Sequence, residues 1–460
     1  MTAAVPFDRS RRPAPGPLRP YHFPAVQRRT LSNGLQLAVV EARSFPVVTV
    51  GLVLPSGALA EPEGKDGVAS LTTALLESGA GSRNAAEIAL VVDGLGLSMD
   101  SWASWDVSEA SFTCLRARAD EGMAVLADMV LRPTFPDDEV ARLRAQRVTS
   151  LAQARGEAGG VAGEFAGLYV FGRESRYGRP MGGTAASVSG IGRDDVAAFH
   201  AAHYRPAGST LFAAGDVSLD ELAALAERHF GAWSGTPPPH APPPPSPERA
   251  ATRIVVADRP GAVQSAIRLS HPAPGRGTPD YFPMIVLNSV VGGNFSSRIN
   301  MNLRERLGYT YGAHSAFGLR RTSGIFMVST AVQTEVTAPS VAEILRDLRE
   351  VREAEVTEAE LADARTFLSG SFPLPMQTTD GLAAKLEALI VNGLPDDYFS
   401  SYRERVMEVT AADVLAAARA HLWPDRAVVI VAGDGARVGP QLEALGLGTV
   451  EVVDPASVLE

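Results

Sequence analysis

Cysteine is almost absent from this sequence, and so are the signals for a membrane or a secretory pathway. The 460 residues include one cysteine, Cys114, which excludes an internal disulfide framework and is compatible with a reducing compartment. No run of about 18 apolar residues predicts a transmembrane helix. The N-terminus contains arginines and prolines but no apolar core of a signal peptide. We therefore expect a cytoplasmic protein without a membrane partner; the periplasm stays open if a leader was removed.

An excess of positive charge is also missing. The formal net charge of −10 argues against nucleic acid or an anionic membrane surface as the main partner, but leaves basic peptides open. With 45% hydrophobic and 20% charged residues, the composition is that of a soluble globular protein. The chain is too long for one compact core, so we expect at least two domains. Cys114 alternates with Ala110 and Phe112 in a predicted strand and is interpreted as a buried structural thiol.

The chain divides into two similar halves around a proline-rich stretch. Residues 235–251 read GTPPPHAPPPPSPERAA, a composition that favours a semi-rigid extended spacer. On either side, DVAAFHAAHYRPAGSTLFAAGDV (195–217) aligns without a gap on DVLAAARAHLWPDRAVVIVAGDG (413–435), at a constant offset of 218 residues. A repeat this long predicts two copies of one domain, because a solenoid repeats every 20–50 residues or so.

Each half combines strands with long helices. LQLAVVE and VVTVGLVL predict strands, whereas NAAEIALVVDGLG, with Asn84 as N-cap, and PDDEVARLRAQRVTSLAQAR predict helices. Strands followed by grouped helices indicate an α+β fold rather than a doubly wound sheet. We expect two homologous domains, each a mixed, mostly antiparallel sheet with helices packed on it.

No motif in the sequence predicts independent catalysis. His200 and His203 form an H-x-x-H pair, but only the second histidine recurs in the other half, which favours a structural role. GGTAAS and VVGGNFSS match neither a P-loop nor a dinucleotide fingerprint, and no G-x-S-x-G is present. An independent enzyme with a relocated metal site has no support in these spacings.

Residues 67–79, GVASLTTALLESG, predict a short amphipathic helix. Its apolar residues recur at helical spacing and form the stripe expected to be buried: Val68, Leu71, Leu75 and Leu76. The other face carries Ser70, Thr73 and Ala74 at i, i+3 and i+4, a spacing at which side chains can converge on one point. None of these three side chains binds a metal tightly or moves a proton near pH 7.

Several motifs taken together resemble the M16 family of zinc metallopeptidases, which includes pitrilysin and mitochondrial processing peptidase. They occur in order along the chain: LSNGLQLAVVE, GVASLTTALLESG, YGRPMGGT, FHAAHYRPAGSTLFAAGDVS and SSRINMNLRERLGYTYGAHS. The resemblance implies a clamshell of two domains. An extension over 1–24 would precede an N-terminal-type domain over 25–234, and the linker 235–251 would lead to a C-terminal-type domain over 252–460.

Active members of that family carry H-x-x-E-H on the helix that matches 67–79. The two histidines hold zinc and the glutamate deprotonates the bound water. Here the first histidine falls on Ser70, the glutamate on Thr73 and the second histidine on Ala74. A third ligand, a downstream glutamate, falls at or next to Leu151, and residues 140–156 contain no Asp or Glu. The resemblance thus implies that this chain has no metal site and no complete catalytic set.

The C-terminal half keeps a different part of the family's chemistry. In the family, an arginine and a tyrosine reach the zinc site, hold the substrate backbone and stabilise the developing oxyanion. The matching LRERLGYTY implies Arg304 and Tyr311 for these roles, with Tyr309 as a competitor. We predict a non-catalytic subunit that pairs with an H-x-x-E-H subunit, which supplies the zinc, and acts on peptides. The alternative is a structural or peptide-binding protein without a catalytic role.

Overall fold

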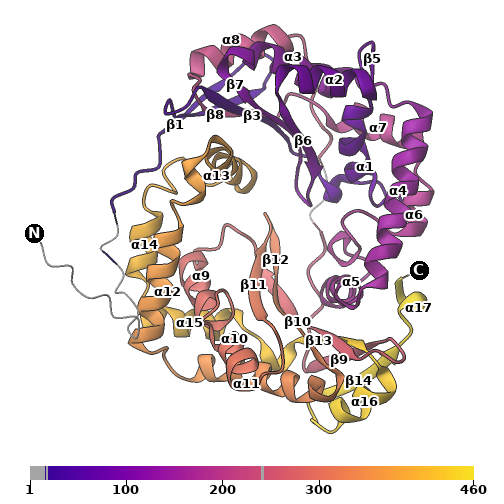
Figure 1. Cartoon of the computed structure of the whole chain (residues 1–460), viewed down its shortest axis with the longest axis vertical. Coiled ribbons are helices and arrows are strands. Elements are labelled where there is room, and N and C mark those ends of the chain that lie inside the picture. Colours follow the sequence, from indigo (N-terminus) through magenta and orange to yellow (C-terminus); the bar gives the residue numbers. More distant parts are fainter. Residues whose placement is uncertain (1–15, 17–18, 240–242, 460) are drawn as a thin grey trace, which may run out of the picture.

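The protein folds into two domains, each with a six-stranded sheet and its helices, that face one another (Figure 1). The computed structural model describes residues 16, 19–239 and 243–459. Parts of the predicted N-terminal extension (1–15, 17 and 18) and of the predicted linker (240–242) lie outside the described residues, as does residue 460. No helix in the described part is both long and apolar enough to cross a membrane.

The first sheet has the order β1-β2-β8-β3-β7-β6 and is antiparallel except for the parallel pair β2–β8. The central strand β3 is buried along nearly its whole length, because elements cover both faces of the sheet, and it therefore reads as an unbroken apolar run. The strands are β1 (Val26–Thr30), β2 (Gln36–Glu41), β3 (Val47–Leu54), β6 (Ser98–Ala103), β7 (Ser108–Leu115) and β8 (Thr210–Gly215).

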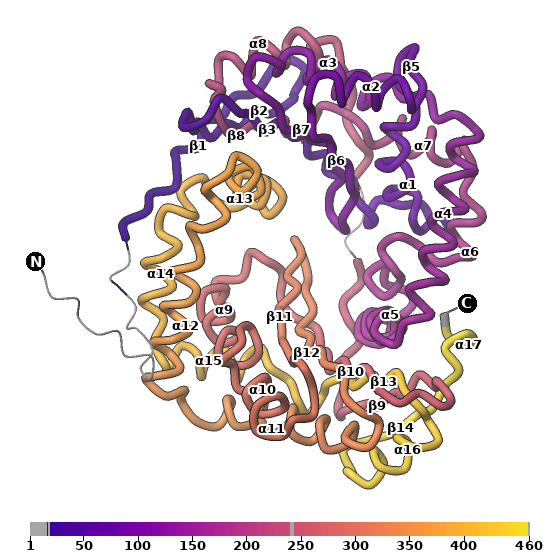
Figure 2. Tube along the Cα trace, viewed as in Figure 1, coloured from indigo at the N-terminus to yellow at the C-terminus, as the bar shows by residue number. Residues whose placement is uncertain are grey.

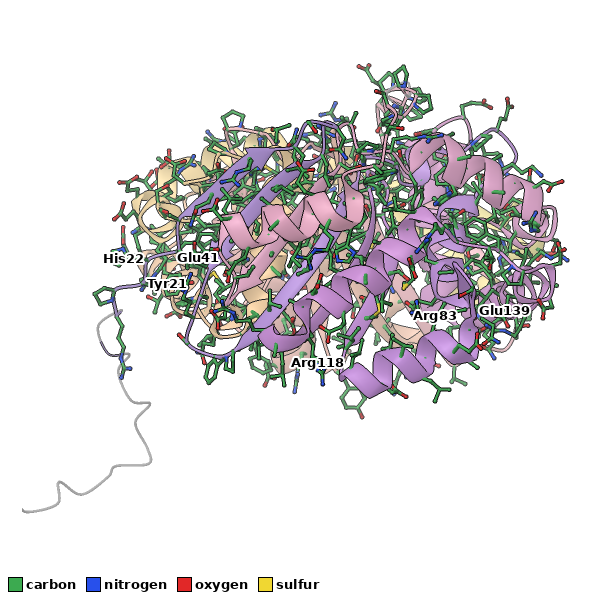
Figure 3. The ribbon with its side chains drawn as sticks, turned by 90° about the horizontal axis from the view of Figure 1, so that it is seen from above. Tyr21, His22, Glu41, Arg83, Arg118 and Glu139 are labelled. Carbon is green, nitrogen blue, oxygen red and sulfur yellow. The ribbon has the colours of Figure 1, made fainter. Side chains whose placement is uncertain are left out.

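Helices cover the outer face of this sheet, as the view from above in Figure 3 shows, where Arg118 marks the exposed outer surface. Asn84 caps α2 with a full capping box, as predicted. A short hairpin, β4 (Gly79–Ala80) and β5 (Arg83–Asn84), precedes that helix. The helices of the first half of the chain are α1 (Val68–Leu75), α2 (Ala85–Leu95), α3 (Ala119–Leu131), α4 (Asp137–Gly156), α5 (Ala158–Phe171), α6 (Ala185–Ser189), α7 (Arg193–His203) and α8 (Leu219–Phe230).

The second sheet has the order β11-β12-β10-β13-β9-β14, with β9 parallel to both β13 and β14. Its strands are β9 (Thr252–Asp258), β10 (Gln264–Pro274), β11 (Ala313–Leu319), β12 (Ser323–Gln333), β13 (Val428–Gly433) and β14 (Gly448–Val453). The helices of the second half of the chain are α9 (Tyr281–Val291), α10 (Arg298–Asn300), α11 (Thr337–Glu353), α12 (Glu358–Ser371), α13 (Thr379–Asn392), α14 (Tyr402–Glu408), α15 (Ala411–His421), α16 (Gly435–Glu443) and α17 (Pro455–Leu459).

The two sheets share five strands of common topology, and the predicted α+β fold with mixed, mostly antiparallel sheets is confirmed. In order and direction, β9, β13, β10, β12 and β11 of the second sheet correspond to β2, β8, β3, β7 and β6 of the first. The remaining strands differ, because β14 is parallel to β9 whereas β1 is antiparallel to β2. The repeat seen in the sequence corresponds to α7 followed by β8 in one domain and α15 followed by β13 in the other. The predicted structural thiol is also confirmed: Cys114 is buried in β7, and burial raises the pKa of its thiol to about 11.

Each half of the chain also contributes one helix that packs on the sheet of the other half. Helix α13 from the second half of the chain packs on β8 and β3 of the first sheet, and α5 from the first half packs on β10 and β13 of the second sheet (Figure 2). Both sheets are thus covered on a second face by a helix that comes from the other half. This exchange explains why the central strands are buried on both sides.

The turn between β11 and β12 makes a second contact between the domains. The Arg320 guanidinium lies 4.4 Å from the ring centroid of Trp105 and 4.2 Å from that of Tyr177, both in the first domain. Burial lowers the pKa of Arg320 to about 10. Beside it, the Arg321 backbone N–H donates to Asp106 Oδ2 at 3.3 Å. Cation–π contacts therefore bind the turn to the first domain.

Two carboxyl groups meet where α13 crosses the first sheet. Glu109 of β7 is buried, and Glu387 of α13 lies beside it. Burial, and secondarily the neighbouring carboxylate, raises the pKa of Glu109, while burial raises that of Glu387. The folded protein therefore holds a proton between them near neutral pH. Because the folded pKa lies above the unfolded value, this pair costs stability as the pH rises from the ordinary carboxyl range towards the folded pKa.

Glu109→Gln is expected to raise the free energy of unfolding by about 2 kcal/mol at pH 8.5 and to change little at pH 5, because an amide cannot ionise and each unit of pKa shift is worth about 1.4 kcal/mol. Urea denaturation at the two pH values measures the difference. The control is Glu355→Gln, at an exposed position of the second half. An equal effect of both substitutions at pH 8.5, or a Glu109→Gln variant that is less stable there, would contradict this account.

Candidate functional site

Helix α1 presents two small side chains to a cavity of about 230 Å³. Ser70 is half-buried and Ala74 is exposed, and both line the cavity together with residues of α4, the cap residue Gly67 and Val188. The apolar stripe that the sequence predicts is buried, and one of its residues, Leu71, also lines the cavity. The cavity is the place at which an H-x-x-E-H motif would present its two histidines.

Thr73 does not share that face, and the expectation that Ser70, Thr73 and Ala74 converge on one point is wrong. Thr73 is only 1% exposed, and its hydroxyl donates to the carbonyls of Ala69 and Ser70 on its own helix. Its carbonyl accepts a hydrogen bond from Ser101 Oγ of β6 at 3.2 Å. The reason is that α1 packs against the edge strand β6, so the residue three positions after Ser70, Thr73, lies on the side of the helix next to that strand.

On α4, Ser150 lines the cavity, whereas Leu151 is buried. The match to the family motif placed the third ligand position at or next to Leu151. In the structure it is the neighbour Ser150 that lines the cavity beside α1. A hydroxyl is a poor ligand for zinc compared with a carboxylate. The three side chains nearest to a metal position are therefore two hydroxyls and a methyl group.

A cation that sequence reasoning missed also lines this cavity. Arg147, half-buried on α4, donates a hydrogen bond from Nε to the carbonyl of Gly182 at 3.2 Å. A Cβ at Gly182 would overlap the guanidinium, so the glycine makes room for it. The sequence offers two separate hints of this contact: an arginine one helical turn before Ser150, and the glycines of YGRPMGGT. Only the fold brings the two together.

A buried ion pair fixes the start of α1. Arg176 donates from Nε and Nη2 to Glu61 Oε2 at 2.9 and 2.6 Å, and both side chains are almost fully buried. The other carboxylate oxygen of Glu61 accepts from the backbone N–H groups of Gly67 and Ala69 at 3.0 and 2.9 Å. Glu61 thereby satisfies donors that the first turn of a helix leaves open. Burial raises the pKa of Glu61 in spite of Arg176, because desolvation outweighs the ion pair.

The segment that carries Arg176 also clasps the loop before α1. Gly183 has a φ of +80°, and a Cβ there would overlap the Asp66 carbonyl. Gly67 has a φ of +100°, and a Cβ there would lie 2.7 Å from the Gly182 carbonyl oxygen. Only glycine meets both requirements without strain. The glycines of YGRPMGGT thus let the backbone pack closely against the loop that leads into α1.

The residues around α1 do not fit a zinc ion. Zinc sites use Cys, His, Asp or Glu, and none of these lines the cavity. Across the described residues, no group of three such side chains is arranged to hold a metal. His200 and His203 contact the Val130 carbonyl and Ser56 Oγ, in keeping with the structural role predicted for them.

The second domain carries Arg304 in a π-helical turn (Met301–Arg306) that continues α10. The Arg304 guanidinium lies 4.8 Å from the Phe295 ring centroid, and its Nε is 3.2 Å from Glu305 Oε1. Tyr311 follows in the loop before β11 and is 95% exposed. Tyr309 instead packs partly buried against the core of the second domain.

The turn that presents Arg304 is anchored from behind. Asn302 is buried and donates from Nδ2 to Asp347 Oδ2 of α11 at 2.9 Å, while its Oδ1 accepts from Arg306 Nε at 2.9 Å. π-helical turns are rare and often occur at functional sites. Figure 1 places α10 in the lower domain and α1 in the upper one, so the arginine and the degenerate helix lie on opposite domains.

These features define a class: a two-domain protein built like a zinc peptidase but without the residues that bind zinc. Two family models match, "Insulinase (Peptidase family M16)" over residues 37–158 and "Peptidase M16 inactive domain" over residues 190–368. The chain belongs to the M16 peptidase family, and it lacks the catalytic motif of that family.

Known relatives agree with this assignment along the chain. An uncharacterized zinc protease of Mycobacterium tuberculosis (strain ATCC 25618 / H37Rv) is 27% identical over 428 residues, which cover 92% of this chain and 96% of that protein. The crystal structure of a peptidase M16 inactive domain from Pseudomonas fluorescens is 27% identical and superposes with a TM-score of 0.84 over 89% of this chain and 98% of the other. A protease structure from Helicobacter pylori, at 19% identity, shares the fold with a TM-score of 0.82 over 89% and 99% of the two chains.

Arg176→Met is expected to lower the free energy of unfolding by about 3 kcal/mol at pH 7, because Glu61 would remain buried without its partner. The loss should be smaller at pH 5, where Glu61 can take up a proton whose folded pKa lies above the unfolded value. Thermal and urea denaturation at both pH values measure this.

The control is Arg179→Met, which removes the ion pair to Asp66 from an arginine that is one-third exposed and should cost no more than about 1 kcal/mol. Equal losses in the two variants would show that Glu61 is not the group that needs the cation.

The purified chain is expected to bind no zinc. Placing ligands at positions 70, 74 and 150 tests whether these positions surround a metal site. A variant with Ser70→His, Ala74→His, Ser150→Glu and Arg147→Ala should bind about one zinc ion per chain, because two histidines at i and i+4 and a facing carboxylate complete a three-ligand site. Metal content after dialysis measures the stoichiometry. The matched variant with Leu151→Glu in place of Ser150→Glu should bind none; the reverse result would assign the third position to Leu151.

Proposed function

We propose that this chain is the non-catalytic subunit of a heterodimeric zinc peptidase. A partner subunit with H-x-x-E-H would carry the zinc and the general base, and this chain would supply Arg304 and Tyr311 to the peptide held between the two. The guanidinium and the phenol would donate hydrogen bonds to the substrate backbone and to the oxyanion that forms at the scissile carbonyl. Purified alone, the chain would cleave nothing.

The observation that carries this proposal is the asymmetry between the two domains. The α1 cavity has only small side chains at the metal positions, while Tyr311 is almost fully exposed and thus free to contact a second molecule. Among the described residues, Arg304 contacts Glu305 and the face of Phe295, and an exposed arginine exchanges such contacts at little cost. The anchoring of Asn302 behind it supports a fixed position for the turn.

A role in peptide binding without catalysis is the second candidate. Strand β6 is an edge strand beside α1, and no further strand pairs with its outer side in the part of the chain that the structure describes. An extended peptide can add to such an edge through backbone hydrogen bonds. This reading needs neither Arg304 nor Tyr311.

Mixing the chain with an H-x-x-E-H partner is expected to give peptidase activity that falls about a hundredfold in Arg304→Ala and clearly in Tyr311→Phe, since removing one oxyanion donor costs a factor of that order. Hydrolysis of a quenched fluorescent peptide measures the rate. Tyr309→Phe is the matched control and should keep full activity. Full activity in both the Arg304 and Tyr311 variants would favour the peptide-binding role.

A further inference from the structure

The α1 cavity has a chemistry of its own. Its polar groups are the Ser70 hydroxyl, the Gln146 amide, the Ser150 hydroxyl and the Arg147 guanidinium, and no acidic side chain lines it. The cavity therefore carries one formal positive charge and is open to solvent along Ala74 and Ser150, both of which are exposed. An anionic group is the ligand that such a lining favours.

Arg147 has hydrogen-bonding capacity to spare. Its one hydrogen bond in the described part of the chain is from Nε to the Gly182 carbonyl, and no carboxylate there lies within ion-pair distance of it. The two terminal nitrogens of the guanidinium keep their donors, in a planar fork that matches the two oxygens of a carboxylate. The contact with Gly182 holds the guanidinium in place.

The surroundings tell what kind of molecule would carry the carboxylate. A volume of about 230 Å³ holds one side chain or one chain end rather than a folded partner. The cavity opens to solvent along Ala74 and Ser150, so an extended peptide can place one acidic group in it while the rest of the peptide stays outside.

We propose that the cavity where active relatives hold zinc binds a peptide carboxylate in this protein, with Arg147 as the bidentate donor and Ser70 as a second donor. The carboxylate is either the C-terminus of a peptide or an Asp or Glu side chain within it. The site belongs to the isolated chain and requires neither a partner nor catalysis, so it stands or falls independently of the proposed subunit role.

The test is peptide binding to the full-length chain alone, measured by fluorescence anisotropy at pH 7.5. Four labelled octapeptides of alanine and serine serve as probes: a free C-terminal acid, its amide, an amide with one central glutamate, and the same peptide with glutamine. One of the acidic peptides is expected to bind about tenfold or more tightly than its neutral counterpart, as hydrogen bonds to a charged group warrant. Tighter binding of the peptide with the free C-terminal acid would identify the ligand as a chain end, and tighter binding of the glutamate peptide would identify it as a side chain.

Variants assign the effect to the cavity. Arg147→Met should reduce binding of the acidic peptide to that of its neutral counterpart, and Arg147→Lys should keep only part of the difference, since an ammonium lacks the fork. Ala74→Leu should abolish the difference by filling the cavity, and it suits an exposed helix position, so it tests the site even if Arg147→Met unfolds. Arg142→Met, at an exposed position of α4 that pairs with Glu139, is the matched control and should bind like the wild type.

Three results would overturn the proposal: no binding of any of the four peptides, equal affinity for the acidic and neutral peptides, or an acid preference that survives both Arg147→Lys and Ala74→Leu unchanged. Raising the salt concentration to 0.5 M should weaken the acidic peptides and leave the neutral ones unchanged.

Discussion

The buried ion pair between Glu61 and Arg176 is the contact on which the geometry of the first domain's site depends. Glu61 bonds the first backbone N–H groups of α1, and Arg176 bonds both Glu61 and the carbonyls of Arg179, Pro180 and Met181. One guanidinium thus ties the start of the helix to the segment that supplies Gly182. A buried pair of this kind adds little net stability compared with apolar packing, but it specifies one arrangement and penalises any other.

The same arginine links that site to the domain contact. Arg176 lies 5.2 Å from the Trp105 ring centroid, and Arg320 of the second domain lies 4.4 Å from it. The ring therefore contacts both the cation that fixes α1 and the cation of the β11–β12 turn. Together with the exchange of α5 and α13 between the sheets, this makes each domain part of the other's core packing.

Loss of the zinc ligands has left the scaffold of α1 intact, because the helix is held by groups that never contact a metal. Its apolar stripe is buried against the core, its first turn is capped by Glu61, and Thr73 faces β6. The face that remains, Ser70 and Ala74 opposite Ser150, is small and therefore open. A cationic side chain, Arg147, lines the same cavity, so its lining carries a positive charge and hydrogen-bond donors.

Much of this protein follows from its sequence alone. The strands 36–41 and 47–54, the helix capped by Asn84, the repeat around α7 and α15, and the absence of ligands at Ser70, Thr73 and Ala74 are local properties, set by periodicity, capping and side-chain chemistry. Tertiary structure alone decided that Thr73 turns away from the cavity, that Ser150 rather than Leu151 faces it, and that Arg147 enters it. Each of these depends on how α1, β6 and α4 pack together, and Arg147 meets Gly182 across 35 residues of chain, a distance over which periodicity carries no information.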